Sequence, residues 1–156
     1  MKDAGTHVTT LVGRGAVAGL GGSVVMTAFQ KLIEMPITER GDSYAPAKLA
    51  QKLLPVHPKD DTARWRLNYA THFTLGAYWG AAYGVAAYAG LRGLRAIAAT
   101  FAAIYTNDVL MVTVLGLSKP WTWSRQDWTI DIVDKFVQVA ATGTIFDRFL
   151  DPTHRS

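Results

Sequence analysis

Four long apolar stretches, each holding at least one ionisable residue, dominate the pattern of this chain. They cover residues 12–33, 69–91, 94–117 and 130–150. Each holds about 20 residues or more, and a helix of that length, at about 1.5 Å per residue, crosses a ~30 Å hydrocarbon core. The pattern predicts an all-α membrane protein whose four transmembrane helices form a bundle. We expect residues 1–156 to form a single domain.

The alternative fold is a soluble four-helix bundle, which would need a polar outer face on every helix. Residues 76–91 carry no charged side chain on any face. The overall apolar fraction of 49% is ordinary for a soluble protein, but much of the charge lies in 36–68 and 118–129, between the apolar stretches. This segregation favours the membrane.

Small residues recur every four positions in the first two stretches. They are Gly15, Gly19 and Ser23 in the first, and Gly76, Gly80 and Gly84 in the second. Such faces let two helix backbones approach closely in lipid. We expect another helix on each face, from this chain or from a partner. On the other faces of 69–91, we expect Tyr78, Trp79 and Tyr83 at lipid or at the interface.

The connection 36–68 contains a short amphipathic pattern. Within 46–54, Leu49, Ala50, Leu53 and Leu54 fall on one side, with the lysines elsewhere. This predicts a short helix in the plane of the membrane interface. The alternative is a solvated loop with one helical turn. Pro36 should end the first helix, because proline has no N–H to donate.

Aromatic and charged residues mark the expected membrane surface. Tryptophan is typical of the interface, and four tryptophans lie near the two larger loops: Trp65, Trp121, Trp123 and Trp128. Glu34 and Arg40 are predicted to form an interfacial ion pair. Arginines in the tight second connection and basic residues near both ends of the chain predict cytoplasmic termini by the positive-inside rule. Basic residues in the long outer loop act against this bias.

Seven polar residues lie inside or at the edge of the spans, where burial in lipid is costly. They are His72, Asn107, Asp108, Asp131, Asp134, Lys135 and Gln138. We expect them to line a bundle interior that is wet at its outer end, as a funnel toward the bilayer centre. Asp131 and Lys135 also have the spacing and order of a helical ion pair.

Each of these residues also has a purely structural interpretation. His72 is either a hydrogen-bonding residue at a packing face or part of a proton relay, with metal or haem ligation as a third interpretation. Asp108 is either a satisfied polar contact or a titrating group on a solute path. The charges near residue 131 either pair at the interface or belong to the site. Carboxylates with imidazole suit several divalent ions, but no spacing demands a metal, so we expect neither metal nor cofactor.

Composition narrows the possible functions. The chain has no cysteine, which excludes disulfides and thiolate chemistry. Its net charge is +4, but the basic residues are scattered and do not form the stripe of a nucleic-acid groove. The serines lack a nucleophile elbow and the glycines match no phosphate loop, so we do not expect an enzyme. No cleavable signal pattern is evident, and the first span is expected to remain as an anchor.

Short motifs along most of the chain resemble the YagU-like family of bacterial inner-membrane proteins, whose molecular function is unassigned. The matching residues are Glu34, Pro36, Arg40, Thr71, His72, Tyr83, Gly116, Leu117, Pro120 and Asp131. The resemblance implies a multi-pass protein of the bacterial inner membrane and no particular activity. The chain departs from the family in its shorter first connection. It also has Lys135 and the pair Asn107–Asp108 where the family can carry histidine.

Two functions fit these features. The first is the handling of ions, protons or small solutes at a polar intramembrane site in which Asp108 titrates, with the protein as a homo-oligomer. The second is a non-catalytic accessory or assembly subunit, which docks onto a larger membrane complex through its glycine faces. The expected surroundings in both cases are the lipid bilayer, without nucleic acid. If both glycine faces pack within one chain, the second hypothesis loses its main support.

Overall fold

The computed structural model describes residues 2–151, with side chains from residue 7, and this range contains helices and loops but no strand. The α-helices are α1 (Lys2–Phe29), α2 (Met35–Thr38), α3 (Ala45–Leu53), α4 (Asp61–Tyr88), α5 (Gly93–Val114) and α6 (Arg125–Ile145). Two π-helical turns, η1 (Gln30–Glu34) and η3 (Phe146–Leu150), continue α1 and α6, and a 3-10 turn, η2 (Pro120–Thr122), precedes α6. The all-α prediction is confirmed.

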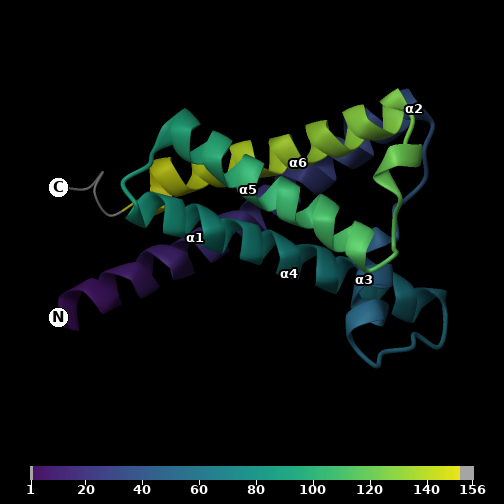
Figure 1. Cartoon of the computed structure of the whole chain (residues 1–156), viewed down its shortest axis with the longest axis horizontal. Helices are drawn as coiled ribbons and strands as arrows, with labels where there is room; N and C mark the ends of the chain where they lie inside the picture. The colour runs from purple at the N-terminus through teal and green to yellow at the C-terminus, as the bar shows by residue number, and fades with distance from the viewer. Residues whose placement is uncertain (1, 152–156) are drawn as a thin grey trace.

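The long helices run between two distinct ends of the molecule. Both termini and the α4–α5 connection lie at one end, here called the terminal end, and α2, α3 and the α5–α6 connection lie at the other, the loop end (Figure 1). This arrangement follows from four long helices that alternate in direction along the chain.

Two helices extend beyond their predicted bounds. α4 begins at Asp61, because Asp60 caps it by accepting a 2.7 Å hydrogen bond from the backbone N–H of Ala63. Trp65 therefore lies inside α4 and not before it. The prediction that Pro36 ends the first helix is wrong. The wide turn η1 and then α2, which contains Pro36, continue the helix, and it ends only at Glu39, which is left-handed with φ 56°.

Two helical segments of the described chain are long and apolar enough to cross a membrane, His7–Thr38 and Gly93–Val114. α4 and α6 are of similar length, with 28 and 21 residues, but are more polar. Charged residues near Asp134 interrupt α6, while glycine, tyrosine and histidine lower the mean hydropathy of α4. By length and composition, the structure thus supports two of the four predicted spans.

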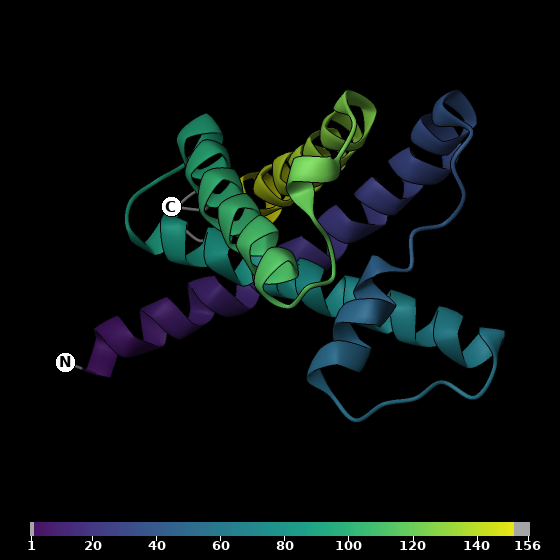
Figure 2. The ribbon, with the colours of Figure 1, turned by 45° about the vertical axis from the view of Figure 1, so that its right-hand side comes forward.

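α1 and α4 cross near their middles, where their small residues meet (Figure 2). A Cβ atom added to Gly19 would lie 2.8 Å from the Cα of Gly80, and one added to Gly15 would lie 2.9 Å from the backbone nitrogen of Gly84. At these distances the space beside each glycine holds its hydrogen atom but no larger side chain. The two small-residue faces therefore occupy each other within a single chain.

α6 packs against another side of α1, and α5 packs against α4 and α6. Ile97 of α5 and Tyr83 of α4 both contact the backbone of α6 near Gly143. Tyr83 is fully buried and Trp79 is 5% exposed, so the prediction that these two rings face lipid or the interface is wrong. α5 and α6 cover this face of α4. Of the three aromatic residues predicted to face lipid, only Tyr78 is exposed.

A polar cluster closes the terminal end. The carboxylate of Asp147 accepts hydrogen bonds from the Tyr83 hydroxyl and from the backbone N–H of Gly93, both at 2.9 Å. Next to it, Arg92 forms an ion pair with the buried Asp151 at 2.5 Å, and Arg14 donates to the carbonyl of Leu150 at 3.0 Å. These contacts join α1, α4, α5 and the end of α6.

The short helix predicted for 46–54 is present as α3, and it packs on α4. Asn68 of α4 holds its start, because its side chain accepts from the N–H of Ala47 and donates to the carbonyl of Ser43, both at 3.0 Å. The apolar side of α3 is divided. Its first half is buried, whereas Leu53 and Leu54 remain more than half exposed, as a helix beside a membrane surface would leave them.

The crossing of α1 and α4 can be tested with Gly80→Ala, whose new Cβ would lie 2.6 Å from the Cα of Gly19. We expect the free energy of unfolding to fall by about 1–3 kcal/mol, the usual cost of overpacking. The matched control is Gly13→Ala, since nothing lies within 4 Å of a Cβ at that exposed position. Unfolding in bicelles compares the two variants, and equal stability would contradict the crossing.

Candidate functional site

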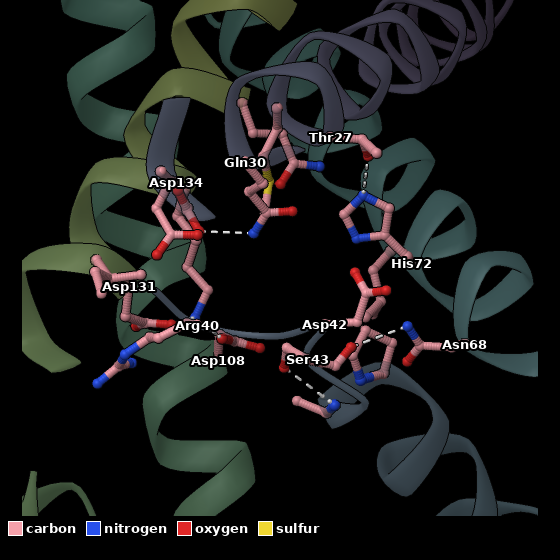
Figure 3. A pocket seen from close by; sticks show the side chains of 18 of the residues that line it. Thr27, Gln30, Arg40, Asp42, Ser43, Asn68, His72, Asp108, Asp131 and Asp134 are labelled. Carbon is pink, nitrogen blue, oxygen red and sulfur yellow. Dashed lines mark hydrogen bonds and ion pairs between the residues drawn. The ribbon is translucent and has the colours of Figure 1, made fainter. Parts of the chain in front are cut away.

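A cavity of about 460 Å³ lies at the loop end, between α1, α4, α5 and α6, with α3 and the loop before it at the rim. Figure 3 shows the polar side chains that face it. Six of the seven predicted polar residues line it: His72, Asp108, Asp131, Asp134, Lys135 and Gln138. Asn107 does not belong to the site. It is exposed, because neighbouring residues of a helix point in different directions and Asp108 takes the inward position.

Three helices meet at the inner end of the cavity. The side-chain amide of Gln138 on α6 donates to the hydroxyl of Ser23 on α1 at 2.9 Å, beside Gly76 of α4. Ser23 is fully buried, and its hydroxyl donates in turn to the carbonyl of Gly19 at 3.1 Å. The absence of a side chain at Gly76 leaves room for this junction.

Asp134 is the most buried acid in the cavity wall, with 5% of the residue exposed. Its Oδ2 accepts a 2.6 Å hydrogen bond from the amide of Gln30 in η1 (Figure 3). Its Oδ1 is buried and has no hydrogen-bond donor among the described residues. No basic side chain forms an ion pair with Asp134 in the described part of the chain, although Lys135 is its neighbour in sequence.

Lys135 instead bridges two other acids. Its ammonium lies 2.5 Å from Oδ2 of Asp108 on α5 and 2.8 Å from Oδ1 of Asp131 on its own helix. The second contact confirms the predicted helical ion pair. All three side chains are largely buried, with exposed fractions between 16% and 26%. This triad joins α5 to α6 and pairs two carboxylates with a single ammonium.

His72 lies on the wall opposite Asp134 (Figure 3). Its Nε2 is 3.1 Å from the hydroxyl of Thr27, and that hydroxyl donates its single proton to the carbonyl of Ser23 at 2.8 Å. In that arrangement the hydroxyl accepts from the histidine, and neutral His72 carries its proton on Nε2. Its Nδ1 is left as a hydrogen-bond acceptor.

Ion pairs surround the mouth of the cavity, but the predicted pair of Glu34 and Arg40 does not form. Glu34 accepts from the hydroxyl of Thr38, one turn further along, at 2.7 Å. Because the left-handed Glu39 turns the chain, Arg40 reaches the start of α6 and pairs with Asp127 at 2.5 Å. Lys31 and Asp42 form a second pair.

Uncharged polar residues of the site were missing from the predicted set. Thr27, Gln30 and Asn68 all line the cavity. Ser23, Thr27 and Gln30 follow the spacing of a single helix face, so the continuation of the small-residue face of α1 into polar residues was a usable signal. Asn68 offered no such periodicity.

The four tryptophans lie at the loop end, in differing surroundings. Trp123 lines the cavity, donates to the hydroxyl of Ser118 at 2.8 Å and contacts the ring of Trp128. Trp65 and Trp121 are 48% and 72% exposed. Their position at one end is that of an aromatic belt.

The lining residues carry an excess of negative charge. Six carboxylates face four lysine or arginine side chains around the cavity. Among the described residues, no group of three or more histidine, aspartate or glutamate side chains is arranged to hold a metal. No family model, curated protein or solved structure matches the chain. Function is therefore inferred from the cavity.

The triad can be tested with Lys135→Met, which leaves two largely buried carboxylates without their cation. We expect a loss of about 3 kcal/mol in the free energy of unfolding. Lys52→Met on the exposed side of α3 is the control and should change stability by less than about 0.5 kcal/mol. Adding Asp108→Asn to Lys135→Met should recover part of the loss in a double-mutant cycle. Equal effects of Lys135→Met and Lys52→Met would contradict the bridge.

The pair at the mouth predicts a titration. Hydrogen bonds from Ser124 and then Arg40 lower the pKa of Asp127 from its usual 3.8 to about 2. Because the folded pKa is the lower one, the stabilisation is present above the unfolded value and is lost as pH falls toward 2. Ser124→Ala should raise the pKa of Asp127 more than Arg40→Gln does, as measured by carboxyl ¹³C NMR. Arg66→Gln should leave it unchanged, and an unaltered pKa in all three variants would contradict these contacts.

Proposed function

We propose that the chain is a four-span membrane protein that handles protons or a small solute through the loop-end cavity. The observation that carries this proposal is a cavity with buried, partly unpaired charge inside a bundle whose outer surface is apolar. The short motifs shared with YagU-like proteins are the basis for proposing membership of that family and the bacterial inner membrane. The termini would be cytoplasmic.

The polarity of the helices supports a bilayer around all four of them. Large apolar side chains are exposed on each long helix, including the two that are less apolar in sequence: Val17, Val24, Tyr78, Val85, Leu110, Val114, Ile132, Val133 and Phe136. Polar residues such as Ser23, Gln138 and Thr142 are buried. Monomeric soluble proteins rarely expose apolar surface so continuously, whereas lipid covers such a surface without cost.

The charges in the cavity support a function beyond packing. Charged side chains inside a membrane are costly and mark ion, proton or substrate paths by default. Replacing a buried ion pair with well-packed apolar residues is often neutral or stabilising, so stability alone does not explain the triad of Asp108, Asp131 and Lys135. Two carboxylates that share one ammonium can also exchange a proton with a solute that enters.

The cavity does not extend through the protein. Its lining residues belong to the loop-end half of the bundle, while Tyr83, Val139 and Phe146 fill the interior nearer the terminal end. Movement of a solute across the membrane would therefore need a rearrangement of the helices or a second copy of the chain. Alternation between outward and inward openings is one such arrangement.

The accessory-subunit hypothesis is less favoured. It required unoccupied glycine faces, and Gly15 and Gly19 lie against Gly80 and Gly84 of the same chain. Purification from native membranes with mass spectrometry distinguishes the two hypotheses. A stoichiometric partner would support a subunit of a larger complex, and a homo-oligomer without a partner would support solute handling.

The proposed function predicts proton flux in reconstituted liposomes, followed with an entrapped pH-sensitive dye. Asp108→Asn should abolish the flux, because it removes the titratable group while keeping the shape of the side chain. Asp61→Asn, at the start of α4 and away from the cavity, is the matched control and should conduct like wild type. A wild-type protein without proton flux would overturn the proton-handling part of the proposal, and equal flux in both variants would overturn the role of Asp108.

A further inference from the structure

One wall of the cavity holds a carboxylate that no cation balances. Asp134 lines the cavity with 5% of the residue exposed, and its Oδ2 accepts only from the uncharged amide of Gln30 among the described contacts. A buried carboxylate without a cation is costly. This position therefore favours a cation that enters the cavity.

Across the cavity, His72 presents a second acceptor. With the Thr27 proton on the carbonyl of Ser23, neutral His72 carries its proton on Nε2 and offers Nδ1 as an acceptor. His72 and Asp134 face each other across the cavity from α4 and α6 (Figure 3). A ligand that satisfies them must bring N–H or O–H donors of its own.

The charged residues around the cavity favour a positively charged ligand. The ammonium of Lys135 is directed to Asp108 and Asp131, and Arg40 and Lys31 pair with Asp127 and Asp42 at the mouth. These cations are thus engaged, whereas Asp134 has only an uncharged amide from Gln30. The wall at Asp134 therefore keeps an uncompensated negative charge, which favours a cation.

We infer that the cavity binds a small organic cation with N–H donors, of the primary ammonium class, with its charged group donating to Asp134. This inference deepens the proposed function and rests on it for the view that the bound molecule is a transported solute. The cation supplies the positive charge that the surroundings of Asp134 lack, together with N–H donors.

The walls and the volume indicate an organic body attached to the ammonium group. Met26, Leu75 and the ring of Trp79 line the cavity together with the polar residues. Apolar walls with a few placed polar groups, around a volume of several hundred Å³, are typical of sites for small organic molecules. An aromatic ring in the wall adds a favourable surface for a cation.

The test is equilibrium binding of benzylammonium to the purified full-length protein in lipid nanodiscs, measured by isothermal titration calorimetry. Benzyl alcohol, which has the same ring without the charge, is the matched probe. We expect saturable binding of benzylammonium and at least tenfold weaker binding of benzyl alcohol. Asp134→Asn should weaken benzylammonium binding about tenfold or more, because it removes a charge-assisted hydrogen bond. Asp61→Asn, outside the cavity, should bind like wild type.

The inference is overturned if benzylammonium does not bind, if benzyl alcohol binds equally well, or if Asp134→Asn binds like Asp61→Asn. The comparison of the two probes uses wild-type protein and so decides the matter even if Asp134→Asn does not fold. Binding and flux are separate measurements. Proton flux that depends on Asp108 without benzylammonium binding would overturn this inference and leave the proposed function standing. Binding without proton flux would overturn the proton-handling part of the proposed function and leave this inference standing.

Discussion

The close approach of α1 and α4 at their glycines is the constraint on which the rest of the structure depends. The two helices are in contact from Leu11 beside Gly84 to Ser23 beside Gly76, and they diverge beyond this stretch. In the bilayer that we propose around them there is no hydrophobic force to join helices, and contact between backbones through small residues takes its place. On the loop-end side, the divergence leaves a space that α5, α6 and α3 surround but do not fill.

The arrangement of the charged residues that line that space follows from the energetic cost of charge away from water. The acids and bases that line it are mostly arranged in pairs, because an unpaired ion away from water is expensive. The triad around Lys135 and the pair of Arg40 and Asp127 satisfy this demand within the chain. Asp134 does not, and the proposed solute-binding role depends on that difference. The closed terminal end, held by Asp147 and Arg92, confines access to one side.

Particular residues show which contacts could be predicted from the sequence and which could not. The every-fourth spacing of small residues predicted close packing, but not whether the faces would meet each other or a partner, since that depends on relative helix position in space. The spacing of Asp131 and Lys135 predicted their contact, because both lie on one helix. The contact of Lys135 with Asp108 joins helices far apart in the sequence and had no local signal. Arg40 was assigned to the wrong acid for the same reason.

The sequence by itself determined the elements whose causes are local: the long helices, the short helix α3 and the polar residues set within the apolar stretches. Periodicity and composition suffice for these, since each depends on neighbours along the chain. Only the tertiary structure decided that Trp79 and Tyr83 are buried and that Asn107 lies outside the site. It also decided that Asp134 has only an uncharged hydrogen-bond partner. These outcomes depend on which helix covers which face, and that is fixed by packing between segments distant in sequence.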